Sequence, residues 1–110
     1  AFLATKLAVL TRTHIRGGRA LILWGGGLTG KAWARALRRR GLVPEAVVDI
    51  HPDRVGQRVQ GIPVIAPDDL PPPGAAFLLG AVATPGARPL IRTFLRERGY
   101  QEGKHFVMVA

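Results

Sequence analysis

The sequence feature that most constrains this chain is a short apolar run, Ala20–Trp24, that leads directly into a glycine-rich turn, Gly25–Gly30. A continuous apolar run of this length is typical of a strand buried on both faces, as in a parallel sheet. From Leu28 onward the apolar residues recur at helical spacing, and Gly41 ends that stretch. The pattern therefore predicts a strand, a tight turn and a helix. The residues expected on the buried side of this helix are Leu28, Ala32, Trp33, Ala36 and Leu37.

Further apolar runs alternate with turn residues along the rest of the chain. The remaining strands are predicted at Ala46–Ile50, Gly61–Ile65, Ala76–Val82 and His105–Val109. A second helix is predicted between them, with Thr84 as its N-cap, Pro85 at its first position and Gly99 at its end. The residues expected on its apolar face are Leu90, Ile91, Phe94 and Leu95.

This order of elements favours parallel strands joined by right-handed crossovers. We therefore predict a Rossmann-like α/β fold of three layers, with about five mostly parallel strands in the order 3-2-1-4-5 between flanking helices. Residues 19–110 are expected to form this domain. Residues 1–18 are expected to form a connector helix, because the apolar residues of Ala1–Ile15 fall near helical spacing and Gly17-Gly18 follows them.

Composition limits the classes of function. The chain has 110 residues, a formal net charge of +9 and no cysteine, which excludes disulfides, zinc–thiolate sites and cysteine nucleophiles. Arginine dominates the charge and accompanies abundant alanine, glycine and proline, so we attribute it to a GC-rich coding sequence and do not expect nucleic-acid binding. A partner domain, an acidic lipid surface or an anionic ligand could use the same charge. We expect no membrane span and a cytoplasmic location.

The glycine turn matches the spacing G-x-G-x-x-G in its required place, between a strand and a helix. Gly25 would allow the sharp turn, Gly27 would leave room for a pyrophosphate, and Gly30 would let the helix pack on the strand. The free N–H groups at the helix start favour an anion. We therefore predict a phosphate-binding turn. Its residues are Gly25, Gly26, Gly27, Leu28, Thr29 and Gly30.

Three further residues are candidates for the same site. Asp49 ends the second strand about twenty residues after the turn, where an acidic residue reaches a ribose hydroxyl in dinucleotide-binding folds. His51 could stack on or bond to a base or sugar, and Thr84 could donate to a ligand. Each has an alternative interpretation: Asp49 caps the His51-Pro52 turn, His51 is a plain turn residue, and Thr84 only caps its helix.

Two kinds of enzyme site are excluded by particular residues. The turn also spells G-x-x-x-x-G-K up to Lys31, but the next position is Ala32, which has no oxygen for magnesium, so we reject a P-loop NTPase. No carboxylate pair, no Ser–His–Asp set and no metal-spaced histidine cluster is present in the sequence. We predict neither catalytic residues nor a metal site.

The segments ILWGGGLTGKAWARAL, VVDIHPDRVGQRVQGIPVIAPDDL and FLLGAVATPGARPLIRTFLRERGYQEGKHFVMV carry a resemblance to a known group of domains. They resemble the Rossmann-like C-terminal domain of some bacterial family 2 glycosyltransferases. The segment with Asp49, Pro52, Gly56, Gly61 and Pro63 is also similar to the N-terminal domain of sugar-nucleotide acyltransferases and to a domain of polysaccharide-biosynthesis dehydratases. The resemblance implies a UDP-sugar near the glycine turn and Asp49, and an upstream glycosyltransferase domain as partner.

Our leading hypothesis is a non-catalytic accessory domain of a glycosyltransferase that binds or senses a nucleotide or sugar nucleotide. The ligand is not identified, and NAD is among the candidates. Two alternatives stay open: an NAD(P)-binding domain cut from an oxidoreductase, and a docking or dimerisation domain without a ligand. Because the chain begins with Ala1, we expect a fragment of a longer protein or a processed N-terminus. A homodimer also stays open.

Overall fold

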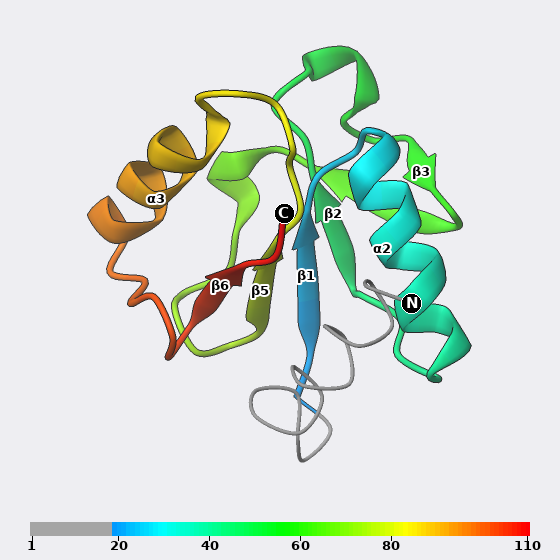
Figure 1. Ribbon diagram of the computed structural model, residues 1–110, viewed down its shortest axis with the longest axis horizontal. Coiled ribbons are helices and arrows are strands. Elements are labelled where there is room, and N and C mark those ends of the chain that lie inside the picture. The colour runs from blue at the N-terminus through cyan, green and yellow to red at the C-terminus, as the bar shows by residue number, and fades with distance from the viewer. Residues whose placement is uncertain (1–18) are drawn as a thin grey trace.

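The computed structural model describes residues 19–110, which form a three-layer α/β domain (Figure 1). The predicted connector helix at Ala1–Ile15 lies outside the described residues. The strands are β1 (Leu21–Trp24), β2 (Ala46–Val48), β3 (Arg58–Val59), β4 (Ile62–Ile65), β5 (Phe77–Gly80) and β6 (Phe106–Met108). The helices are α2 (Leu28–Arg39) and α3 (Ala87–Glu97), with 3₁₀ turns η1 (Pro52–Arg54) and η2 (Pro67–Asp69).

The six strands form one sheet in the order β3-β4-β2-β1-β5-β6. All neighbours pair in parallel except β3 and β4, which pair antiparallel. Without β3, the order is the 3-2-1-4-5 arrangement expected from the sequence, so the predicted Rossmann-like fold is confirmed. The strand β3 was not expected. It is a two-residue hairpin partner of β4, and its turn places Gln60 and Gly61 at φ angles of +51° and +79°.

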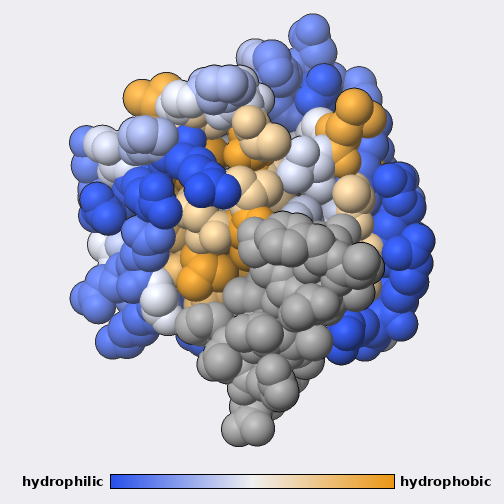
Figure 2. Space-filling model, viewed as in Figure 1, coloured by the Kyte–Doolittle hydropathy of each residue, from blue (hydrophilic) through white to orange (hydrophobic). Residues whose placement is uncertain are grey.

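Side-chain alternation along the strands divides the core into two layers. Leu21 and Leu23 of β1 pack with Trp33 and Leu37 of α2 on one face of the sheet. Ile22 and Trp24 point the other way, into a cluster that contains residues of α3. Figure 1 shows the two helices on opposite sides of the sheet. Hydrophilic residues gather over both helices, and apolar residues lie between them on this face (Figure 2).

The sequence assigned two leucines to the core wrongly. Leu28 is 86% exposed and Leu90 is 74% exposed, although each lies on the apolar side of its helix. Both stand in the first turn of a helix, and the rest of residues 19–110 leaves their side chains largely uncovered. The buried residues of α2 are Gly30, Trp33, Ala34, Ala36 and Leu37, and those of α3 are Ile91 and Leu95.

The predicted start of α3 was also wrong. Thr84 is not the N-cap, because the helix begins at Ala87 after Gly86, and no side chain caps it. The N–H of Ala87 donates to the Thr84 carbonyl at 3.1 Å, and Gly86 has φ +81° and ψ −7°. These are the features of a type II turn with Pro85 and Gly86 in its centre. Pro85 therefore belongs to the turn before the helix.

Tyr100, which belongs to the core cluster that contains residues of α3, binds the proline-rich segment that precedes β5. The residue is buried, and its hydroxyl donates to the Pro71 carbonyl at 2.6 Å. Burial raises the pKa of the Tyr100 phenol above its ordinary value of 10.0. None of the helices within residues 19–110 is long and apolar enough to cross a membrane.

Substitution at the two leucines of α2 distinguishes core from surface. Leu37 is fully buried, so Leu37→Ala should lower the free energy of unfolding by about 2–5 kcal/mol. Leu28→Ala should change it by less than about 0.5 kcal/mol, because that side chain is exposed. Urea denaturation measures both values. Equal losses at the two positions would contradict the exposure of Leu28.

The buried phenol predicts a dependence of stability on alkaline pH. Because the folded-state pKa of Tyr100 is raised, the stability contributed by the neutral phenol is fully present below pH 10.0 and is lost as the pH rises above it. Tyr100→Phe should cost about 1 kcal/mol at neutral pH and should make the alkaline loss of stability smaller. Denaturation curves of both proteins at neutral and alkaline pH test this prediction. An equal loss of the free energy of unfolding in the two proteins between neutral and alkaline pH would refute it.

Candidate functional site

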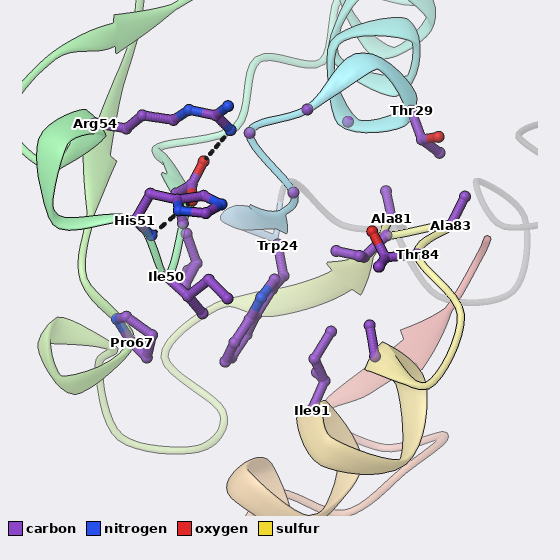
Figure 3. A pocket seen from close by; sticks show the side chains of 18 of the residues that line it. Trp24, Thr29, Ile50, His51, Arg54, Pro67, Ala81, Ala83, Thr84 and Ile91 are labelled. Carbon is purple, nitrogen blue, oxygen red and sulfur yellow. Dashed lines mark hydrogen bonds and ion pairs between the residues drawn. The ribbon is translucent and has the colours of Figure 1, made fainter.

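A pocket of about 590 Å³ lies at the carboxyl ends of β1, β2 and β5, between the starts of α2 and α3 (Figure 3). The strand order reverses between β1 and β5, because β2 lies on one side of β1 and β5 lies on the other. Ligands of open α/β sheets bind outside such a reversal. The volume is within the range of pockets that hold small molecules.

Two glycines of the turn are required by the packing of the protein itself. Gly25 has φ +145°, and a Cβ added there would lie 2.4 Å from the Ala81 carbonyl oxygen. A Cβ added at Gly30 would lie 1.7 Å from the Gly25 carbonyl oxygen, closer than any real contact. The start of α2 therefore packs directly on the end of β1. These positions explain two of the three motif glycines without a ligand.

Gly27 has no such internal role. A Cβ added there meets no atom within 4 Å, and its φ of −87° suits any residue. Gly27 is the N-cap of α2, no side chain caps the helix, and its first turn has no acidic residue. Lys31 donates the first backbone bond, to the Gly27 carbonyl at 2.9 Å, so the N–H groups of Leu28, Thr29 and Gly30 precede it. An open glycine beside an uncapped helix start is suited to an anion.

Asp49 is the one buried polar or charged residue in the part of the chain that the structure describes, at 5% exposure. Its Oδ1 accepts a bond of 2.9 Å from the His51 backbone N–H, and its Oδ2 accepts one of 2.9 Å from Arg54 Nη1 (Figure 3, dashed lines). The same Oδ2 lies 2.0 Å from where a Gly26 Cβ would be. Asp49 thus makes the turn-capping contact and also packs against the glycine turn.

The pocket brings together all the residues that the sequence selected. Its lining includes Gly25, Gly26, Gly27, Leu28, Thr29, Gly30, Asp49, His51 and Thr84. Thr84 lies opposite the glycine turn, and since it does not cap α3 its hydroxyl is not committed to the helix. Ligand binding by these residues stays a prediction.

The apolar wall of the pocket was not predicted from the sequence. Trp24 and Phe94 meet edge to face, with ring centroids 5.5 Å apart. The guanidinium of Arg98 stacks on Phe94 at 3.6 Å and also pairs with Asp68 at 2.5 Å. Ile91 also lines the pocket, near Trp24 (Figure 3). The available signal was the apolar face of α3, which the sequence assigned to the core.

Exposed apolar residues surround the mouth of the pocket. Leu28, Ile50 and Leu90 all line it, and they are three of the four large exposed hydrophobic residues in residues 19–110. Apolar side chains left in solvent around one pocket mark a surface for binding. In the same part of the chain, no group of three or more His, Asp or Glu residues could hold a metal ion.

Comparison with solved structures agrees with the Rossmann-like fold of this domain, and two other comparisons found no match. No family model matches the chain, and no curated protein matches it. The chain is similar to the solved structure of RSP in complex with β-NADH, with a TM-score of 0.64 and 14% identity over 94% of this chain. It is also similar to RSP in complex with β-NAD⁺ and operator DNA, with a TM-score of 0.61 and 15% identity over 83%. The chain spans 59% and 49% of those two RSP chains.

Substitution of Gly27 or Gly30 by alanine tests which of the two glycines the packing of the protein requires. Gly30→Ala should lower the free energy of unfolding by about 1–3 kcal/mol or more, because its Cβ would meet the Gly25 backbone. Gly27→Ala should cost less than about 1 kcal/mol, because the added methyl meets only open space. Thermal and urea unfolding give both numbers. A larger loss at Gly27 than at Gly30 would overturn this division.

Proposed function

We propose that this domain binds a nucleotide through its phosphates, and that a dinucleotide of the NAD(H) type is the best-supported ligand. The observation that carries the proposal is the open space at Gly27, which lines the pocket and begins a helix that no side chain caps. A phosphate needs this space and these N–H donors. The similarity of fold to two RSP structures that contain β-NAD⁺ and β-NADH supports the choice of dinucleotide.

Each part of the pocket has a role in this proposal. The pyrophosphate lies at the start of α2, where the N–H groups of Leu28 and Thr29 donate to it and the helix dipole favours its charge. The apolar wall of Trp24, Ile91 and Phe94 receives a ring of the ligand. Such a pocket of mostly apolar walls with a few polar groups fixes the orientation of a small molecule.

A sugar nucleotide is the second candidate. It carries the same pyrophosphate, so the same turn would serve it, and the resemblance to accessory domains of family 2 glycosyltransferases favours it. The glycosyltransferase context, the upstream catalytic partner and the cytoplasmic location remain predictions. The operator DNA of the RSP complex is not carried over to this chain, because the match spans only 49% of that RSP chain.

In either case we propose binding without catalysis. Among residues 19–110, Asp49 is the only carboxylate that lines the pocket, and both of its oxygens accept bonds from the protein's own donors. His51 lines the rim, and its bond to the Asp49 carboxylate is made by its backbone N–H; among the described residues its imidazole has no carboxylate or hydroxyl partner. General acid–base work needs a group positioned to exchange a proton with a substrate, and the proposal assigns none.

Calorimetric titration tests the proposal with NAD⁺, NADH, a UDP-sugar and S-adenosylmethionine as ligands. S-adenosylmethionine has an adenosine but no phosphate, so it controls for binding through the base alone. The proposal expects NAD⁺ or NADH to bind, S-adenosylmethionine not to bind, and Gly27→Val to weaken binding at least tenfold while the unfolding temperature stays close to that of the natural chain.

The other outcomes decide between the candidates. Binding of the UDP-sugar alone would favour the sugar-nucleotide candidate over the dinucleotide. Absence of heat with every nucleotide, from a chain that unfolds cooperatively, would overturn nucleotide binding and leave the docking alternative. Equal binding by the natural chain and Gly27→Val would show that the phosphate does not use the glycine turn.

A further inference from the structure

The carboxylate at the end of β2 is poorly placed to receive a ribose. A ribose with two free hydroxyls presents two donors, which need open acceptor oxygens. The Asp49 side chain is 4% exposed, and it packs against the Gly26 backbone. Each of its oxygens already accepts a bond of 2.9 Å, from the His51 N–H and from Arg54. Because the side chain is buried, little of those oxygens is exposed to a ligand at this rim.

Arg54 presents the opposite chemistry at the same place. Its side chain is 46% exposed and lines the pocket. A guanidinium has five N–H donors, and within residues 19–110 its one contact is from Nη1 to Asp49. Figure 3 shows Arg54 extending toward Asp49 beside the glycine turn. The pair thus holds the guanidinium in place and leaves its remaining donors open to the pocket.

We infer that Arg54, and not Asp49, binds the ligand at the end of β2, and that Arg54 selects a nucleotide with a phosphate on its ribose. This inference rests on the proposed function, because it places the ligand's ribose at that rim. The N–H donors of a guanidinium suit an anionic phosphate better than a pair of hydroxyls, because the hydroxyls also need acceptors for their own protons. The shared chemistry is a ribose phosphomonoester. NADP(H) carries it at the 2′ position, and coenzyme A carries it at the 3′ position.

The charges that face this position agree with the inference. Asp49 alone would repel a phosphate, but Arg54 compensates its charge at 2.9 Å. No other acidic residue of the described part of the chain lines the pocket, and His51, which is exposed, lies next to the pair. Removal of the guanidinium would leave an uncompensated carboxylate with one of its oxygens released. The preference for a phosphate should then be lost or reversed.

Two pairs of ligands measure the effect of the ribose phosphate on binding. NADP⁺ differs from NAD⁺, and coenzyme A differs from dephospho-coenzyme A, by one ribose phosphate only. Calorimetric titration of the natural chain should show at least tenfold tighter binding of the phosphorylated member of one pair. The pair that shows it distinguishes the 2′ from the 3′ position. The same titrations are made with Arg54→Gln, Arg54→Lys and Arg58→Gln.

Arg58→Gln is the matched control, because it removes the same charge from an exposed arginine that does not line the pocket and bonds to the Gly61 carbonyl. Arg54→Gln should abolish or reverse the preference, Arg54→Lys should keep part of it, and Arg58→Gln should leave it within about twofold. A preference that survives Arg54→Gln would overturn the role of Arg54.

The failure of this inference is distinguishable from the failure of the proposed function. If NAD⁺ binds at least as tightly as NADP⁺, and dephospho-coenzyme A at least as tightly as coenzyme A, the selection of a ribose phosphate is overturned while nucleotide binding stands. If none of the four ligands binds to the folded chain, the dinucleotide is overturned as the ligand of this site, and this inference falls with it.

Discussion

The close approach of α2 to the end of β1 is the constraint on which the rest of the structure depends. A methyl group at Gly30 would lie 1.7 Å from the Gly25 carbonyl oxygen, so the approach requires glycine at position 30. It brings the uncapped start of the helix to the edge where the strand order reverses. The position of the pocket therefore follows from a contact within the backbone, and any ligand meets a site that is already formed.

The turn is held from its other side by Asp49. This carboxylate packs against Gly26, caps the turn after β2 and pairs with Arg54, so one buried charge joins the glycine turn to the rim of the pocket. A buried charge is costly unless it is paired and hydrogen-bonded, and here both conditions are met. The arrangement gives the acidic residue a structural role and leaves the exposed guanidinium to face a ligand.

Most of the fold and the composition of the site could be predicted from the sequence, because buried strands and a glycine turn leave strong local signals. The sequence could not predict what depends on tertiary contacts. Leu28 and Leu90 have helical spacing, but the other residues in the range 19–110 leave both exposed. The N-cap at Thr84 was wrong because the left-handed conformation of Gly86 makes a turn first. The pairing of Arg54 with Asp49 joins a 3₁₀ turn to a strand end, which no spacing rule describes.

Nuclear magnetic resonance of the backbone amides tests the central claim most directly, because it observes the donors themselves. In the proposed complex, the N–H groups of Leu28, Thr29 and Gly30 donate to a nucleotide phosphate. Titration with NAD⁺ or NADP⁺ should move these three resonances most among the described residues, and inorganic phosphate should move the same three less. Shifts confined to another face of the domain, with these amides unchanged at saturating nucleotide, would contradict the account.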